Sequence, residues 1–304
     1  MPTIDLLSGR SVSRMADPVE MGVTLPDEAR LSRTFALLAP NRMSVPPIFT
    51  RVATDDGQHV DLLAKLQRLR GSIYLEDGAI ESWQLTEDGR HSISSDETSW
   101  HLLSMRYGEV AGCARLQVHA PTIPFCELAV AQSALAESDV WGPALRLSVM
   151  AEMQRAQVEQ LSFIEAGGWA LAPELRCTTE ALHIALGSYA LGELLGGCLG
   201  LSTATLRHHS ASILKRLGGF SFMWDEQALP AYYDPAYRCE MELVRFDSRM
   251  PSPKYRGLVD NIKDELALAL VLCGTTKPAT RQRSSMALAN VQQVSMSQRA
   301  AFRN

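Results

Sequence analysis

A short run of residues in the second half of the chain has the composition of an anion-binding helix start. Arg176 is followed by Thr178 and Thr179, either of which can cap a helix, and Glu180 and Ala181 then begin a long apolar helical stretch. The first amides of a helix have no intrahelical partner, and the helix dipole favours negative charge beside them. With a nearby basic side chain these features predict a phosphate site, although the same residues also suit an ordinary helix start after a loop arginine.

A glutamate lies inside the apolar segment that precedes this run. Residues 162–171 read SFIEAGGWAL and predict a buried strand, because they mix β-branched, aromatic and small residues. A carboxylate there is costly unless it is paired or takes part in chemistry, and burial is expected to raise the pKa of Glu165 towards that of a general base. A salt bridge with Arg115 is the structural alternative. The neighbouring Gly167 and Gly168 predict a bulge or a close approach of a ligand.

Several segments follow one another in an order that resembles a known family. They are IFTRVAT (48–54), DETSWHLL (96–103), GEVAGCARL (108–116) and YYDPAYRCEMELVRFD (232–247). In this order they are similar to segments of the N-acyl amino acid synthases and the acyl-homoserine lactone synthases, one branch of the GNAT acyltransferase superfamily. The resemblance covers residues 47–250.

The expected phosphate site also matches this superfamily. Arg176, Thr179 and Ala181 stand at the offsets of the R-x-x-G-x-G/A loop that binds pantetheine phosphates in GNAT enzymes, with threonine and alanine in place of the glycines. Thr178 and Glu180 lie between them. The loss of glycine removes the closest approach to a pyrophosphate, so the resemblance leaves open whether the donor is coenzyme A or the phosphopantetheine of an acyl carrier protein.

The resemblance implies an α+β (α/β) fold of the GNAT type, with a mixed, mostly antiparallel sheet, a splayed strand pair and helices on both faces. An acyl thioester would enter between strand 162–171 and the strand after it, where backbone amides near Ala170 and Leu171 would bind its carbonyl oxygen. The implied activity is direct transfer of a long-chain acyl group to the amino group of an amino acid or similar small amine. No covalent intermediate, metal or permanently bound cofactor is implied.

Three residues receive proton-transfer roles from the resemblance. Glu165 occupies the place of a strand glutamate that orients or deprotonates the acceptor amine. Many GNAT enzymes protonate the departing thiolate from a tyrosine or serine in the helix after the next strand, where this chain offers Ser210 and Ser212 but no tyrosine. Both serines also suit helix capping.

Four further residues are placed at the substrates by analogy. Arg68 or Arg115 would hold an acceptor carboxylate through a bidentate pair. Trp169 would form a wall of the acyl or acceptor site, or fill the core. His101 begins an apolar strand and either lines the acceptor pocket or is a hydrogen-bonded structural histidine.

Three other functions stay open at this point. An acyl-homoserine lactone-type signal synthase fits less well, because AGGWAL follows Glu165 where that family has E-x-S-R-F. A non-catalytic GNAT-fold module that binds an acyl thioester or carrier protein is suggested by the missing glycines and tyrosine. A short-chain acyltransferase acting on a protein or a drug differs from the leading prediction in chain-length preference.

Composition predicts a globular enzyme of the cytoplasm. The 304 residues are 46% hydrophobic and 21% charged, with a net charge of −5, which argues against nucleic-acid binding. No apolar run reaches the ~18 residues of a membrane span, and the N-terminus lacks the pattern of a secretory signal. The six cysteines include no C-x-x-C pair and the histidines lack zinc spacing, which argues against a metal site.

Four regions are expected along the chain: an N-terminal extension (1–46), the acyltransferase domain (47–250), an additional helix (251–274) and a basic tail (275–304) that could contact an acidic carrier protein. The oligomeric state is left open. Strands are predicted near 48–54, 73–76, 101–107, 109–118, 161–171, 201–206 and 239–246. Helices are predicted near 58–70, 143–158, 178–195, 209–217 and 255–273.

Overall fold

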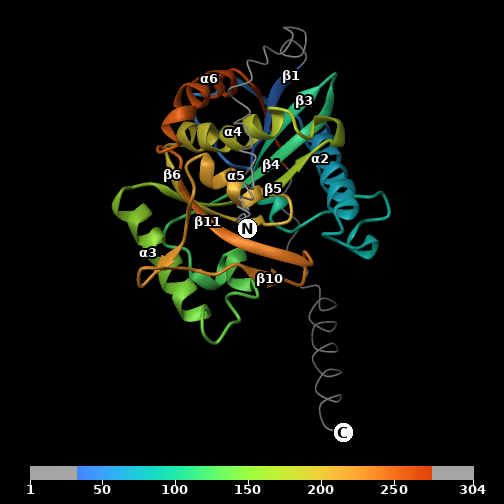
Figure 1. The fold of residues 1–304 in the computed structure, drawn as a ribbon. Coiled ribbons are helices and arrows are strands. Elements are labelled where there is room, and N and C mark those ends of the chain that lie inside the picture. Colours follow the sequence, from blue (N-terminus) through green and yellow to red (C-terminus); the bar gives the residue numbers. More distant parts are fainter. Residues whose placement is uncertain (1–32, 276–304) are drawn as a thin grey trace, which may run out of the picture. The chain divides into compact units, whose positions relative to one another are not determined.

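The computed structural model describes residues 33–275, which form a mixed sheet with helices on both faces (Figure 1). The helices are α2 (Asp56–Glu76), α3 (Gly142–Val158), α4 (Glu180–Leu194), α5 (Ser210–Arg216) and α6 (Arg256–Ala267). The strands of the main sheet are β1 (Arg33–Leu38), β2 (Arg51–Thr54), β3 (Trp100–Arg106), β4 (Glu109–His119), β5 (Ser162–Leu171), β6 (Cys198–Thr205), β7 (Phe220–Ser221), β10 (Tyr232–Asp234), β11 (Cys239–Asp247) and β12 (Leu270–Cys273). A separate hairpin pairs β8 (Met223–Trp224) with β9 (Gln227–Ala228).

The strand order is β10-β11-β6-β5-β4-β3-β1-β12-β2, with β7 attached to β11. Strands β5 and β6 are parallel, and β12 is parallel to both β1 and β2. The pairs β3–β4, β4–β5, β6–β11, β7–β11 and β10–β11 are antiparallel. The predicted fold class, a mixed α and β architecture with a predominantly antiparallel sheet, is therefore confirmed.

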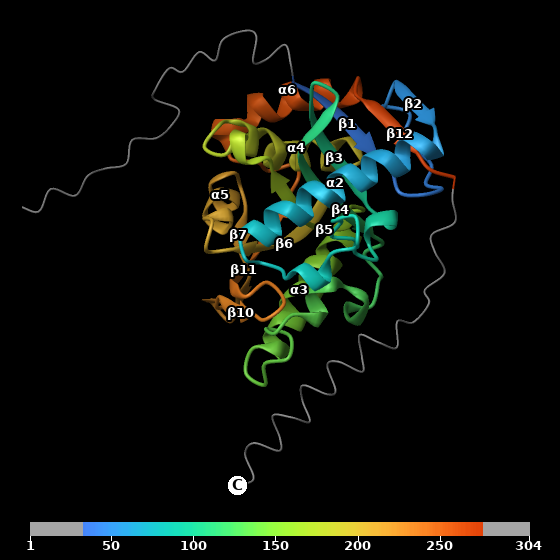
Figure 2. The same cartoon turned by 90° about the vertical axis from the view of Figure 1, so that its right-hand side faces the viewer.

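The two faces of the sheet carry different helices because strand side chains alternate. On β3, Leu102 packs against α4 and α6, whereas Leu103 packs against α2. Helix α3 lies on the same face of the sheet as α2 but further along it, where α3 packs on Phe163 and Leu201. Helices α4 and α6 lie side by side (Figure 1), and Figure 2 shows α2 crossing the opposite face. Gly187 of α4 allows close packing, since a Cβ there would lie 2.5 Å from Leu102.

Two predicted elements are wrong. The strand expected at 73–76 is the last turn of α2, which begins after Asp55 caps the amide of Gln58 at 2.9 Å. Gly71 does not end this helix. Its missing side chain instead admits the following loop, because a Cβ would lie 2.7 Å from the carbonyl oxygen of Gly89 and 3.1 Å from the amide of His91.

The second error concerns the helix expected at 255–273. Helix α6 ends at Ala267, and LVLC (270–273) forms β12 between β1 and β2. Strand β1, which the sequence did not predict, supplies the partner for β12. The boundaries expected for the domain, 47–250, cut through this sheet, because β1 and β12 lie outside them. The greater part of the N-terminal extension (1–32) and the basic tail beyond Thr275 lie outside the described residues. No helix within residues 33–275 has the length and apolar character to cross a membrane.

Candidate functional site

Strands β5 and β6 separate partway along their length. Their pairing runs from Ser162↔Cys198 to Ala166↔Ser202 and then stops, although both strands continue. On its other edge β5 stays paired with β4, but Cys113 and Arg115 face Ala170 and Gly167, so β5 carries one extra residue. Beyond Ala166 the backbone groups of β5 that face β6 have no strand partner. The expected opening between these strands is present.

The extra residue forms a β-bulge at Gly168. Its φ of +64° lies in the left-handed region that favours glycine. The bulge predicted from Gly167 and Gly168 is confirmed. The carbonyl of the next residue, Trp169, accepts a hydrogen bond from the hydroxyl of Tyr74 at 3.4 Å, which ties the bulge to α2.

A cavity of about 50 Å³ lies at this opening, on the face that carries α4. Trp169, Ile184, Tyr189 and Phe246 provide much of its apolar wall. The rings of Tyr189 and Phe246 pack together with centroids 5.6 Å apart. Such a lining suits an acyl group.

Two serines that were not predicted as site residues, Ser188 and Ser202, also line this cavity. Ser202 belongs to the last residue pair of β5 and β6, and Ser188 stands on α4 one turn after Ile184. The sequence held one signal for Ser188: it is four residues after Ile184, so the two side chains lie on the same face of the helix. The predicted serines lie elsewhere: Ser210 accepts a hydrogen bond from Thr205 at 3.4 Å, and the exposed Ser212 donates to the carbonyl of His209 at 2.8 Å.

The predicted phosphate site is a helix start, as expected. Helix α4 begins at Glu180, whose backbone amide donates to the hydroxyl of Thr178 at 3.2 Å, so Thr178 and not Thr179 provides the side-chain cap. The amides of Ala181 and Leu182 follow in the first turn, where a helix has no internal partner for them. The side chain of Glu180 points away from this site.

The side chain of Glu180 is hydrogen-bonded to strand β3. Its carboxylate accepts hydrogen bonds from Ser104 at 2.5 Å and from Arg106 at 3.2 Å, and only 3% of Glu180 is exposed. The prediction that Glu180 contributes to phosphate binding therefore has no support from its side chain, which is turned inward and already paired.

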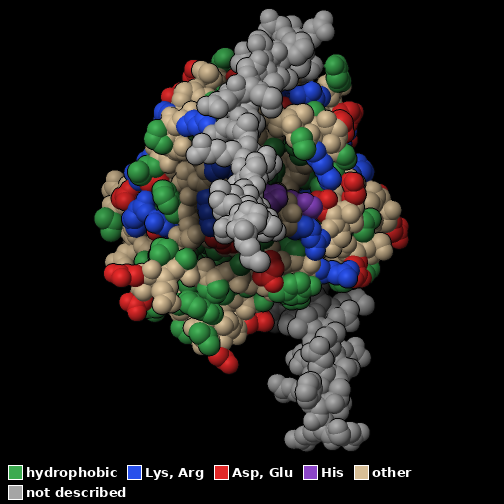
Figure 3. All heavy atoms as spheres, viewed as in Figure 1, with side chains coloured by type: hydrophobic (Ala, Val, Ile, Leu, Met, Phe, Trp, Pro, Cys, Tyr) green, Lys and Arg blue, Asp and Glu red, His purple; other side chains and the backbone are tan. Residues whose placement is uncertain are grey.

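Arg176 also has partners in the protein. Its guanidinium lies 3.2 Å from Asp77 and 3.6 Å from Glu76, while Asp77 also lies 3.5 Å from His208. Arg207 donates to the carbonyl of Asp77 at 2.6 Å. Basic and histidine side chains gather on this face of the molecule (Figure 3). The side chain of Arg176 is 41% exposed, so an anion can reach it, but that anion would have to compete with Asp77, which is 18% exposed.

The opposite face of β4 carries a buried ion pair. Arg70 and Asp96, each 1% exposed in the side chain, form a bidentate pair with N–O distances of 3.0 and 2.6 Å. Burial alone would raise the pKa of Asp96, but the hydrogen bonds and charge of Arg70 hold it below its ordinary value. The ring of His101 is hydrogen-bonded to the carbonyl of Asp96 at 2.8 Å, and burial lowers the pKa of His101 to about 4. His101 is thus part of this buried structural cluster.

Arg115 lies beside this pair without a carboxylate of its own. One of its terminal nitrogens donates to the hydroxyl of Ser95, and no acidic group in residues 33–275 comes within ion-pair distance of it. Burial lowers the pKa of Arg115. The nearby charge of Asp96 opposes this shift, and the charge of Arg70 acts in the same direction as burial. A Cβ at Gly167 would lie 3.5 Å from its Nη2, which places the guanidinium against the bulge. Arg68, the other predicted carboxylate ligand, is exposed and pairs with Asp88 at 2.9 Å.

Glu165 has different partners from those expected. Its carboxylate accepts hydrogen bonds from His119 at 3.1 Å and from the backbone amides of Ala129 and Val130 at 2.9 and 3.0 Å. The alternative salt bridge with Arg115 is therefore wrong. Burial alone would raise the pKa of Glu165, but these hydrogen bonds hold it below its ordinary value, opposite to the predicted shift. Its catalytic role stays a prediction.

No family model and no curated protein matches the chain. Among solved structures, a coenzyme A-dependent acyl-homoserine lactone synthase, BjaI, with S-adenosylmethionine and isopentyl-coenzyme A, is 14% identical, with a TM-score of 0.48 over 85% of this chain and 99% of that one. FeeM, an N-acyl amino acid synthase from uncultured soil microbes, is 9% identical, with a TM-score of 0.43 over 72% of this chain and 93% of that one. An acyl-CoA N-acyltransferase from Pseudomonas aeruginosa is 13% identical, with a TM-score of 0.39 over 71% and 99%. The chain is thus similar in structure, at low identity, to acyl-homoserine lactone synthases, an N-acyl amino acid synthase and an acyl-CoA N-acyltransferase.

Proposed function

We propose that the protein transfers an acyl group from a thioester of coenzyme A or an acyl carrier protein to the amino group of a small acceptor that carries a carboxylate, such as an amino acid. The observation that carries the proposal is the position of Arg115, a partly buried cation without an ion-pair partner in residues 33–275, at the bulge where β5 leaves β6. Asp96 attracts Arg115 but is ion-paired with Arg70, and a partly buried cation without its own ion pair favours an anionic ligand. The acyl cavity lies across the sheet from it, beside the same opening.

The chemistry assigned to this opening is direct attack. Backbone amides of β5 beyond Ala166 would bind the thioester carbonyl oxygen as it gains charge. The neutral amine forms a bond to the carbonyl carbon and the carbon–sulfur bond breaks. One proton leaves the nitrogen for water and one reaches the sulfur, so the products are an amide and a thiol. Ser202 is the cavity hydroxyl that we assign to the departing sulfur, because it stands where the strands separate.

Glu165 receives a supporting role in this proposal. Three hydrogen bonds occupy its carboxylate, and a pKa below the ordinary value makes it a weak base at neutral pH. Its partners Ala129 and Val130 belong to the segment that covers β5 on the face of α3. Glu165 would therefore hold this cover in place and orient the ring of His119.

A mass-spectrometric screen tests the function. The purified protein would be mixed with short-chain and long-chain acyl thioesters, on both coenzyme A and carrier protein, and with pooled amino acids and uncharged amines. We expect an N-acyl amino acid to form from at least one donor. Thioester recovered intact with every acceptor would contradict the proposal and favour a non-catalytic thioester-binding module.

The size of the cavity leads to a prediction about acyl length. Tyr189 and Phe246 line a cavity of only about 50 Å³, so we expect a long acyl chain to enter it only if the Phe246 ring is displaced. Phe246→Ala is expected to raise kcat/KM for an octanoyl donor relative to a butanoyl donor by roughly tenfold, because pocket size discriminates methylenes at about this level. The ratio is measured with paired thioesters of one carrier.

Two further variants control for this change. Phe220→Ala removes a ring that is 56% exposed and should leave the octanoyl-to-butanoyl ratio unchanged. Phe246 is 9% exposed, so its truncation costs stability, and Phe246→Leu provides a milder change in the same direction. An unchanged ratio in both folded Phe246 variants would show that this cavity does not hold the acyl chain.

A further inference from the structure

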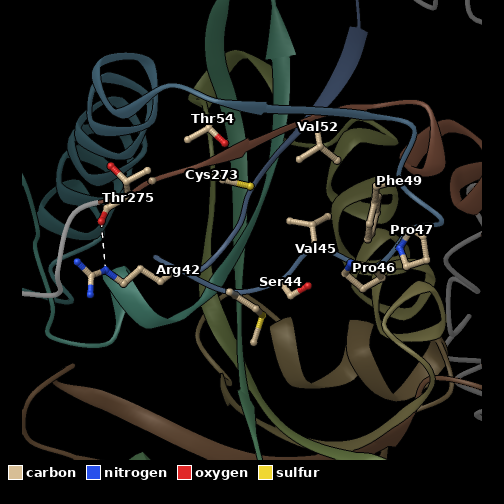
Figure 4. A pocket seen from close by; sticks show the side chains of 12 residues that line it. Arg42, Ser44, Val45, Pro46, Pro47, Phe49, Val52, Thr54, Cys273 and Thr275 are labelled. Carbon is tan, nitrogen blue, oxygen red and sulfur yellow. Dashed lines mark hydrogen bonds between the residues drawn. The ribbon is translucent and has the colours of Figure 1, made fainter.

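A second and larger cavity lies at the far edge of the sheet. It has a volume of about 580 Å³ and is formed by β2, the end of β12 and residues 42–49 before β2 (Figure 4). Strands β4, β3 and β1 stand between β5 and β12, which corresponds to roughly 19 Å at the usual strand spacing. We call it the edge groove. It is separate from the acyl opening.

One part of the edge groove is apolar and firmly packed. Val45, Pro46, Pro47, Phe49 and Val52 line it. Phe49 is 4% exposed and stacks on Trp100 of β3, with ring centroids 5.7 Å apart. Val52 keeps 46% of its surface exposed. Binding of an apolar ligand over this wall is favourable, because it removes apolar surface from water.

The other end of the edge groove carries a cation. The backbone amide of Arg42 donates to the carbonyl of Gly274 at 3.2 Å, and its side-chain Nε donates to the carbonyl of Thr275 at 3.2 Å. The terminal nitrogens of Arg42 have no acidic partner within the described chain. Arg42 also has a φ of +63°, a left-handed conformation that costs a non-glycine residue roughly 1–2 kcal/mol. Figure 4 shows its side chain beside Thr275, away from Pro46, Pro47 and Phe49.

We propose that the edge groove binds an aliphatic monocarboxylate, with the carboxylate on the terminal nitrogens of Arg42 and the chain along Val45, Val52 and Phe49. The groove volume falls within the range of about 300–1,000 Å³ of small-molecule sites, which are mostly apolar with a few placed polar groups. The hydrogen bond from Nε of Arg42 to the carbonyl of Thr275 orients the guanidinium before the ligand arrives, which lowers the cost of binding. This site needs no acyl-transfer activity.

Calorimetric titration of the full chain with decanoate tests the proposal. Val52→Trp fills the groove from an exposed position and is expected to abolish decanoate binding. Arg42→Asn removes the charge with a residue that tolerates a positive φ, and it is expected to weaken decanoate binding roughly tenfold, as for one charge-assisted hydrogen bond. Binding of the uncharged decanol should not change in this variant. Arg51→Ser is the matched control, because Arg51 is exposed and neighbours Val52 but points to the opposite face.

Three results would overturn the assignment: no decanoate binding by the full chain, decanoate binding that survives Val52→Trp, or equal losses in Arg42→Asn and Arg51→Ser. The acyl-transfer assay is run on the same proteins. Because the edge groove is distant from the acyl opening, Val52→Trp should retain turnover. Failure of the groove proposal and failure of the acyltransferase proposal are therefore seen in separate measurements.

Discussion

Replacement of Arg115 by glutamine is expected to raise the KM for an amino acid acceptor by roughly 100-fold, the effect of losing two charge-assisted hydrogen bonds to a carboxylate. The KM for the corresponding amino acid amide, which has no carboxylate, should change little. The reason is the isolation of Arg115: it donates to Ser95, but no acidic group in the described structure pairs with it. Initial rates with the two acceptors, at one fixed thioester concentration, measure the difference.

Loss of folding should not explain this effect. Burial and the repulsion from Arg70 outweigh the attraction of Asp96 and lower the pKa of Arg115, so removal of the charge should leave the free energy of unfolding unchanged or raise it. Arg68→Gln is the matched control, since Arg68 is exposed and pairs with Asp88 on the surface. Equal losses with the acid and the amide acceptor would contradict carboxylate recognition by Arg115.

Asp96→Asn is expected to give the largest loss of stability, about 3–5 kcal/mol in the free energy of unfolding, because it leaves Arg70 buried without an opposite charge. Urea unfolding at pH 7 measures this loss. Asp61→Asn is the control, because Asp61 is exposed and pairs with Lys65 at 3.4 Å on the surface of α2, where an ion pair contributes little. Similar losses in the two variants would contradict the importance of the buried pair.

The Arg70–Asp96 pair also predicts how the free energy of unfolding depends on pH. The pKa of Asp96 is lower in the folded protein than its ordinary value of about 4. Its contribution to stability is therefore complete above that ordinary value and is lost as the pH falls through the lower folded pKa. The stability difference between the wild type and Asp96→Asn should be full at neutral pH and should shrink at pH values below about 4. A difference that grows on acidification would contradict this assignment.

Local sequence patterns predicted the centre of the fold well. Residues 162–171 read as a strand from composition alone, and the adjacent Gly167 and Gly168 marked the bulge, because a positive φ strongly favours glycine. Thr178 and Thr179 likewise marked the start of a helix, which Thr178 caps, since a cap depends only on neighbours in the sequence.

The edges of the sheet could not be predicted in this way. LVLC at 270–273 continues an apolar run that began in a helix, and only the parallel partners β1 and β2 make it a strand. Residues 73–76 continue α2. Gly71 does not end this helix, and its missing side chain leaves room for the loop at Gly89 and His91. Both outcomes depend on segments far away in the sequence.

The candidate site shows the same division. The amino-acid sequence by itself determined which segments form the central strands and helices, where β5 bulges, and that Glu165 and Arg115 lie in apolar strands. Only the tertiary structure decided their partners: Glu165 pairs with His119 and two backbone amides, Asp96 pairs with Arg70, and Arg115 is left without an acid. Strand alternation fixes the face on which a side chain lies, but the pairing of a buried charge depends on which distant groups reach it first in three dimensions, and that choice sets its pKa and its availability to a ligand.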